Sequence, residues 1–255
     1  MADGPGKQVP TVATSTGMAR VLRELSSRSG PGLIGGDPLE CARVLGVDGV
    51  AVSLVTGGAL SELVWSSPGV SERLEDEQYT LGEGPGVDSV GSCAVVVEPD
   101  LARVRADRWP VLLPALAGLG VGAVFCFPLR IGGVCLGVLT AQRGAPGPLT
   151  AAAMDDALIL SAAVTAVVLD GAGRTESFAT AGSGAPLHRA AVHQASGMIS
   201  VQAGVSVAQA LILLRAHAYR HETPLLRVAE DVVARRLRFR HTGDGPDPSF
   251  EKKRG

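Results

Sequence analysis

The chain has 255 residues, a formal net charge of −2 and a hydrophobic content of 46%, which is enough to bury a sizeable core. Aromatic residues make up only 4%, so this core has to be mainly aliphatic. The four cysteines are widely spaced and the polar N-terminus lacks a signal segment, which predicts reduced thiols in the cytoplasm. Asp155, Asp156 and Ser161 interrupt the apolar stretch Ala151–Leu169, so we expect no membrane span.

Local patterns in residues 16–170 predict one domain that mixes helices and strands. Residues 1–15 are expected to form a flexible tail. Asp37-Pro38 is an N-cap followed by proline at the first helical position, and Gly57-Gly58 separates two strand-like runs. The predicted elements are helices over Met18–Leu25 and Asp37–Leu45, a hairpin of Val50–Val55 and Leu60–Trp65, a helix over Val70–Glu77, a strand over Val95–Val97, a helix over Trp109–Leu119, a hairpin of Gly122–Arg130 and Val134–Gln142, and a helix from Leu149 to Leu169.

Two glycine-rich sites in this domain carry more specific expectations. The sequence LGEGPGVDSV has three glycines and a proline within five residues, which predicts a loop with unusual backbone angles over Gly82, Glu83, Gly84 and Pro85. A two-residue turn at Gly132-Gly133 would pair residues whose numbers sum to 265. Cys126 would then lie opposite Leu139. Cys126 and Cys135 would lie roughly 13 Å apart, too far for a disulfide bond.

The order of these elements predicts an antiparallel sheet with flanking helices. The stretches that carry a family resemblance are LGEGPG at 81–86, VVVEPDL at 95–101, Trp109-Pro110, FPLRIGG at 127–133 and LGVL at 136–139. Together they resemble a GAF domain. The resemblance implies an α+β fold with a pocket on one face of the sheet, and the loop Gly82, Glu83, Gly84 and Pro85 is then expected to shape the lid of this pocket. It also implies sensing of a small molecule, light or a redox signal in place of catalysis.

We expect this domain to hold no cofactor and no metal. Residues 1–186 contain no histidine, which argues against His-ligated haem and most transition-metal sites. The Gly82–Gly86 segment lacks the Lys-Ser/Thr of a phosphate-binding loop, and Glu83 would repel phosphate. Many GAF relatives have cysteine where this chain has Gly86, and the four cysteines are expected to be small buried hydrophobes. No catalytic motif is present, so the chain is not expected to be an enzyme.

Charge is divided unevenly along the chain. Residues 1–186 carry 12 basic and 19 acidic residues, whereas Leu187–His241 carries eight arginines, three acidic residues and all five histidines, a formal charge of +5. The Gly/Ala/Ser/Thr-rich segment 171–186 predicts a linker between the two parts, and 242–255 a second tail. A small basic helical module suits a polyanion, with an ordinary solvated helix face as the alternative.

Residues 187–241 predict a bundle of three short helices. The first runs from Leu187 to Gln202 and ends at Gly204, the second starts with a Ser206–Gln209 capping box, and the third starts at Thr223-Pro224. The expected inner faces consist of Leu187, Ala191, Ala195, Met198 and Ile199, then Ala210, Leu213, Leu214 and Ala218, then Leu225, Val228, Ala229, Val232, Val233 and Leu237. The arginines are expected to lie on the outward faces.

The spacing Ala195-x-Gly197, Leu214-Arg215-x-x-Ala218 and Val228-Ala229 is similar to the ANTAR family of RNA-binding antitermination domains. The resemblance implies a dimeric bundle that binds paired stem-loops in nascent messenger RNA. Ser196 stands where the family often has a basic residue. The candidate RNA contacts are Arg215, Arg220, Arg227, Arg235, His193, Gln194 and Tyr219. Arg215 belongs to the matched motif, and its alternative role is a salt bridge to Glu230 or Asp231.

The sequence therefore predicts a cytoplasmic RNA-binding antitermination regulator whose front domain senses a small molecule or a redox signal. A homodimer is expected through the helix at Ala151–Leu169, with the apolar stripe Met154, Leu158 and Val164-Thr165. Two alternatives stay open. The bundle binds an acidic protein partner, or the front domain is a redox or metal sensor with the bundle as its output.

Overall fold

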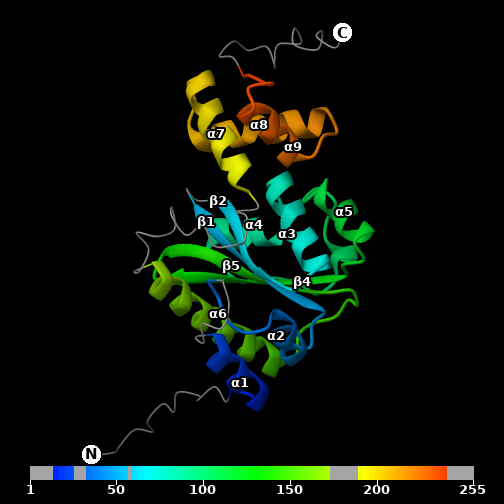
Figure 1. Cartoon of the computed structure of the whole chain (residues 1–255). Helices are drawn as coiled ribbons and strands as arrows, with labels where there is room; N and C mark the ends of the chain where they lie inside the picture. Colours follow the sequence, from blue (N-terminus) through cyan, green and yellow to red (C-terminus); the bar gives the residue numbers. More distant parts are fainter. Residues whose placement is uncertain (1–13, 26–32, 57–58, 173–188, 240–255) are drawn as a thin grey trace, which may run out of the picture.

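The computed structural model describes residues 14–25, 33–56, 59–172 and 189–239. The predicted tails, except for residues 14 and 15, and nearly all of the predicted linker lie outside these ranges. The described part contains a five-stranded antiparallel sheet covered by helices and a separate group of three helices beyond one of its faces (Figure 1). The predicted α+β class is therefore confirmed.

The sheet has the strand order β2-β1-β5-β4-β3. Its strands are β1 (Gly49–Thr56), β2 (Ala59–Ser66), β3 (Val96–Glu98), β4 (Ala123–Ile131) and β5 (Val134–Arg143). β4 is buried from Ala123 to Leu129 on both faces, which explains why its sequence is almost continuously apolar.

The β4–β5 hairpin departs from the predicted register. Close to the turn the pairs Ile131–Val134 and Arg130–Cys135 follow the prediction, but a β-bulge between Leu129 and Arg130 then shifts the pairing by one residue. Cys126 therefore pairs with Thr140, and the predicted pairing with Leu139 is wrong. A sequence-based count from the turn cannot anticipate the additional residue.

One face of the sheet packs against α1 (Thr16–Leu25), α2 (Pro38–Leu45) and α6 (Ala151–Ala172). Asp37 caps α2 by accepting a hydrogen bond from the Leu39 amide, and Gly46 ends the helix with φ 66°, so both predicted ends of this helix are confirmed. Figure 1 shows these three helices on one side of the strands. The apolar residues of these helices and of β1, β4 and β5 form a single hydrophobic cluster. It is mainly aliphatic and also contains Phe125, Phe127 and Trp65.

Helix α6 is long and apolar enough to cross a membrane by length and composition, contrary to the expectation from its sequence. Ala157, Leu160, Val164 and Val168 are nevertheless buried against the sheet, as in the core helix of a globular domain. The predicted dimer stripe is also wrong in part, because Val164 and Thr165 are buried within the domain and Met154 packs against its core. Leu158 is the stripe residue that is exposed.

The other face of the sheet packs against α3 (Val70–Leu81), α4 (Pro85–Ser92) and α5 (Leu112–Gly118), with a 3₁₀ turn η1 (Leu101–Arg103) between β3 and α5. The predicted loop after Leu81 is only partly a loop. Gly82 and Gly84 have positive φ values of 70° and 133°, but Pro85 then begins α4 at the first helical position, where its missing N–H has no consequence.

The three remaining helices are α7 (Ala190–Ala203), α8 (Val207–Arg220) and α9 (Leu225–Val233). Gly204 ends α7 with φ 66°, and the capping box of Ser206 and Gln209 begins α8, as predicted. Helix α9 begins one residue later than expected and ends at Val233, so the predicted helical run to Leu237 is wrong. Arg235 has φ 60° in the following turn, and Leu237 and Phe239 then pack back on the bundle.

Candidate functional site

The core of the bundle contains most of the motif that carries the ANTAR resemblance. Ala195, Leu214, Ala218, Val228 and Ala229 are all buried in the cluster that joins α7, α8 and α9. Their small or branched side chains allow three short helices to approach closely. These motif residues therefore build the scaffold, and any ligand contacts come from residues around them.

The arginines of the bundle fall into paired and unpaired groups. Arg227 forms an ion pair with Glu230 at 2.7 Å, and Arg236 forms one with Asp231 at 2.6 Å. Arg220, Arg235 and Arg238 are exposed, and none of the three forms an ion pair with another described residue. Surface ion pairs such as Arg227–Glu230 and Arg236–Asp231 contribute little to stability. Their arginines can therefore easily exchange the carboxylate for a phosphate.

Arg189 does not lie on an outward face, so the expectation for this residue is wrong. Its side chain is only 3% exposed, and it joins the bundle to the sensor domain. Its Nη2 donates to the Glu75 carbonyl and to Oδ1 of Asp76, both at 3.1 Å, and its Nη1 lies 3.5 Å from the Ser61 carbonyl. The guanidinium also lies 3.9 Å from the centre of the Tyr79 ring. A desolvated cation over an aromatic ring is a favourable arrangement.

Arg215 lies at the same interface. Its Nη2 donates to the Tyr79 carbonyl at 2.5 Å, and its guanidinium lies 5.4 Å from the Tyr79 ring centre. A Cβ added at Gly82 would come within 2.7 Å of Nη1 of Arg215, so the glycine leaves room for this side chain. Burial lowers the pKa of Arg215 from its ordinary value. Glu230 and Asp231, the alternative partners expected from sequence, pair with Arg227 and Arg236 instead.

Tyr79 is the residue that both domains share. It belongs to α3, yet its buried ring is part of the hydrophobic cluster of the bundle. Burial raises its pKa to about 12, and its hydroxyl has no hydrogen-bond partner among the described residues. The sequence contained no signal for this role, because it depends on how α3 and α7 meet in space.

The remaining candidate contacts lie on the surface of the bundle. His193 is exposed, with its Nε2 3.6 Å from the Glu62 carboxylate of the sensor domain. Gln194 is exposed on α7, and Tyr219 on α8 is 66% exposed and so is not part of the core. Ser196, which replaces the basic residue common in the family, is buried and donates its hydroxyl to the Val192 carbonyl at 2.8 Å.

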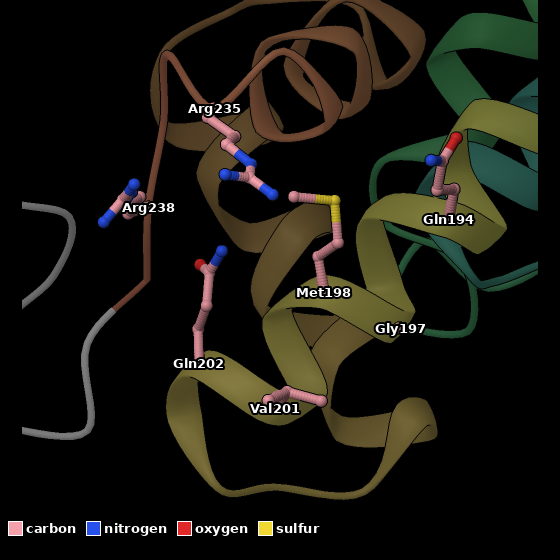
Figure 2. Close-up of a pocket in the computed structure, with 7 residues that line it drawn as sticks. All are labelled: Gln194, Gly197, Met198, Val201, Gln202, Arg235 and Arg238. Carbon is pink, nitrogen blue, oxygen red and sulfur yellow. The ribbon is translucent and has the colours of Figure 1, made fainter.

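A hollow of about 480 Å³ lies between α7 and the turn that follows α9 (Figure 2). It brings two of the predicted contacts, Gln194 and Arg235, to one surface, together with the motif glycine. Its lining residues are Gln194, Gly197, Met198, Val201, Gln202, Arg235 and Arg238.

The predicted pocket-loop residues connect three helices. Gly82 ends α3, and Pro85 begins α4. Glu83 accepts hydrogen bonds from the Val111 and Leu112 amides at 2.8 and 2.7 Å, which satisfies two unpaired N–H groups at the start of α5. A Cβ at Gly84 would come within 2.5 Å of Leu112, so α5 packs directly on this loop.

A buried polar group links the interface to the sheet. Glu75 and Gln78 lie one turn apart on α3, and both side chains are fully buried. Ser53 on β1 donates to Glu75 at 2.5 Å, and Gln78 donates to it at 3.0 Å. Burial raises the pKa of Glu75. Its carbonyl accepts the hydrogen bond from Arg189, so one residue contacts both the sheet and the bundle.

Two of the four cysteines are close neighbours. All four are free, and Cys41 and Cys126 are buried as expected. Cys93, at the end of α4, and Cys135, at the start of β5, are only half-buried. Burial and the neighbouring Cys93 thiol both raise the pKa of Cys135. Within the described ranges no group of three or more His, Cys, Asp or Glu side chains is arranged to hold a metal ion.

The fold and the site together define a protein with an α+β domain docked on a helical bundle, in which Arg189 and Arg215 of the bundle donate hydrogen bonds to α3. The GAF domain family model matches residues 39–168, half of the chain, and the ANTAR domain model matches residues 183–233. The chain belongs to the GAF domain family and carries an ANTAR domain after its GAF domain. Both are regulatory domain types.

Several solved structures have a similar fold over the GAF domain. One is the GAF domain of a phosphoenolpyruvate-protein phosphotransferase from Acinetobacter, with 13% identity and a TM-score of 0.45, covering 62% of this chain and 93% of that one. Another is the GAF domain of a phosphoenolpyruvate-protein phosphotransferase from Coxiella burnetii, with 15% identity and a TM-score of 0.46. The match covers 62% of this chain and 98% of that one. A search of curated proteins gives no match.

Proposed function

We propose that this chain is a cytoplasmic transcription antitermination regulator that binds RNA hairpin loops through its ANTAR domain. The supporting observation is the group of exposed arginines, Arg220, Arg235 and Arg238, which lack a carboxylate partner in the described part of the bundle. RNA loops present phosphates together with unstacked bases, and arginine binds both. Arg227, His193, Gln194 and Tyr219 are also exposed, and we include them in the proposed contact surface.

Arg215 has a different role in this proposal from the one its motif suggested. In the docked arrangement its guanidinium is occupied by the Tyr79 carbonyl and packed against Gly82. We therefore assign it to the interface between the domains. RNA bound to the exposed surface of α7 and to the turn after α9 does not have to displace it.

We further propose that a small molecule bound by the GAF domain changes how the bundle is held. Helix α3 is the connecting element, because one of its residues, Glu75, has contacts on both sides. The carboxyl group of Glu75 contacts the sheet, and the backbone carbonyl of Glu75 contacts Arg189. A ligand that moves α3 would move the acceptors of Arg189 and Arg215 with it. Regulation would then follow from a change in docking, in a homodimer that presents two bundles to paired stem-loops.

The test is selection with full-length protein from a library of two-hairpin RNAs whose loops are randomised. We expect enriched loop sequences, and binding that weakens steeply with salt. Replacing Arg220, Arg235 or Arg238 by Gln is expected to weaken binding and to lower the salt slope by about 0.7 for each lost phosphate contact to single-stranded RNA. Arg105→Gln, on an exposed ion pair of the sensor domain, is the matched control. Failure to enrich any RNA at low salt would contradict the proposal and favour an acidic protein partner.

A redox signal is a second candidate input, and the contact between Cys93 and Cys135 favours it. A peroxide would oxidise one thiol to a sulfenic acid, and the other thiol would then displace water and form a disulfide. Peptide mapping after peroxide treatment should find this pair joined while buried Cys41 and Cys126 stay reduced. Cys93→Ser is the control, because it cannot form this disulfide. If Cys93 and Cys135 stay unlinked in the parent protein, the redox input is contradicted and the small molecule is the candidate input that is left.

A further inference from the structure

We infer that the hollow on α7 is a receptor for one unstacked base of an RNA loop, whose flanking phosphates are held by Arg235 and Arg238. This inference rests on the proposed function and names the part of the RNA that this site takes. The volume of about 480 Å³ falls within the range of ordinary small-molecule sites, about 300–1,000 Å³.

The floor of the hollow is an apolar stripe on the outer face of α7. Gly197, Met198 and Val201 follow Gln194 at helical spacing, so all four lie on the same side of the helix. Val201 is 86% exposed, more than any other large hydrophobic residue described. An exposed apolar surface with a polar rim is typical of a binding site, since nothing in the fold of the domain requires it.

Gly197 is the most informative residue in the stripe. It lies inside α7, and after proline glycine is the least favourable residue for a helix interior. A Cβ added at Gly197 would meet no atom within 4 Å, so internal packing does not explain the absence of a side chain. The glycine does leave the surface of the helix open at this position, which lets a planar base approach it.

The rim supplies hydrogen-bonding groups. Oε1 of Gln202 accepts a hydrogen bond from the Phe239 amide at 3.1 Å, which holds the side chain and leaves its NH₂ group to act as the donor. Figure 2 shows Met198 and Arg235 extending toward each other, with Gln202 pointing into the same space. An amide and a guanidinium beside an apolar floor match the polar edge and the flat face of a base.

The charge of the rim favours RNA over an apolar ligand. Arg235 and Arg238 both come from the turn after α9, and neither forms an ion pair with another residue in the described ranges. None of the described residues that line the hollow is acidic. The positive φ of Arg235, 60°, belongs to the turn that carries both arginines to the rim. The two guanidinium groups that this turn carries are complementary to the phosphates that precede and follow a base.

The first experiment fills the hollow without changing the fold. Gly197→Leu places a side chain in open space on a helix, and Gly118→Leu makes the same change at an exposed helical glycine of α5 that also has no atom within 4 Å of an added Cβ. The full chain is titrated with an RNA enriched from the randomised-loop library. We expect Gly197→Leu to weaken binding about tenfold or more, and Gly118→Leu to leave it unchanged.

The second experiment uses the unaltered chain, so it decides the question even if the variant is unstable. The chain has four methionines, and a ¹³C-methyl label on them gives a probe inside the hollow at Met198. A base stacked there should shift the Met198 methyl signal through its ring current. Met18, buried under the sheet, and Met154 on α6 should not move.

The outcomes separate this inference from the proposed function. RNA binding that is equal in Gly197→Leu and parent, with a fixed Met198 signal, would overturn the base site and leave RNA binding intact. A chain that binds no RNA would overturn both. A Met198 shift produced by an acidic peptide and not by RNA would also overturn the inference, in favour of a protein partner.

Discussion

Replacing Arg189 by Ala should release the bundle from the sensor domain while leaving both domains folded. Arg189 is a deeply buried charge at the interface, and its partners are the Glu75 carbonyl, Asp76 and the Tyr79 ring. Removing one member of a buried ion pair costs about 3–5 kcal/mol when the remaining charge stays buried. Here Asp76 is 44% exposed and can be hydrated, which reduces that cost.

The magnitude follows from the contacts that are lost. Hydrogen bonds to charged groups are worth about 1.5–3 kcal/mol, and a desolvated cation–π contact about 2 kcal/mol. The unpartnered Nε of Arg189 offsets part of this gain. A loss of roughly 2–4 kcal/mol in docking free energy would reduce the docking equilibrium constant by about 30- to 1,000-fold. Arg189→Lys keeps the charge but cannot donate in several directions at once, so we expect a smaller effect.

Hydrogen exchange and small-angle scattering on the full chain measure this change. Arg189→Ala should raise the radius of gyration and speed amide exchange in the C-terminal half of α3 and in α7. Arg220→Ala, an exposed arginine of the same bundle, is the control and should match the parent. Scattering and exchange that are identical in Arg189→Ala and parent would refute the assignment of Arg189 as the anchor.

Three further predictions concern buried polar groups. Tyr79→Phe should keep or raise the melting temperature, because the buried hydroxyl has no partner among the described residues, whereas Tyr79→Ala should lower it. Burial lowers the pKa of His217 below its ordinary value of 6.5, so its stabilising contribution is complete above that pH and is lost as the pH falls through the folded pKa. His217→Phe should therefore flatten the fall in melting temperature between pH 7 and pH 5, and an unchanged profile would exclude His217 as its source. Burial raises the pKa of Glu75, so its contribution is lost as the pH rises through the folded pKa, and Glu75→Gln should not lower stability at neutral pH in a denaturant titration.

Local chemistry determined much of the architecture, and those elements are readable in the sequence. The ends of α2, the C-terminus of α7 and the start of α8 depend on Asp37, Gly46, Gly204 and the Ser206–Gln209 capping box. Each of these signals acts within four or five residues, so no tertiary contact is needed to interpret it. The antiparallel pairing of β4 and β5 followed likewise from the turn at Gly132-Gly133.

Only the tertiary structure decided which of the seven described arginines of the bundle are available to a ligand. Arg189 is buried and Arg215 half-buried, and both donate hydrogen bonds to α3, more than 100 residues away along the chain. The bulge that moved Cys126 opposite Thr140, and the turn that carried Arg235 to the hollow on α7, also depend on long-range packing. Whether a side chain is buried, and which partner it has, depends on two surfaces that meet. One segment of sequence specifies only one of these two surfaces.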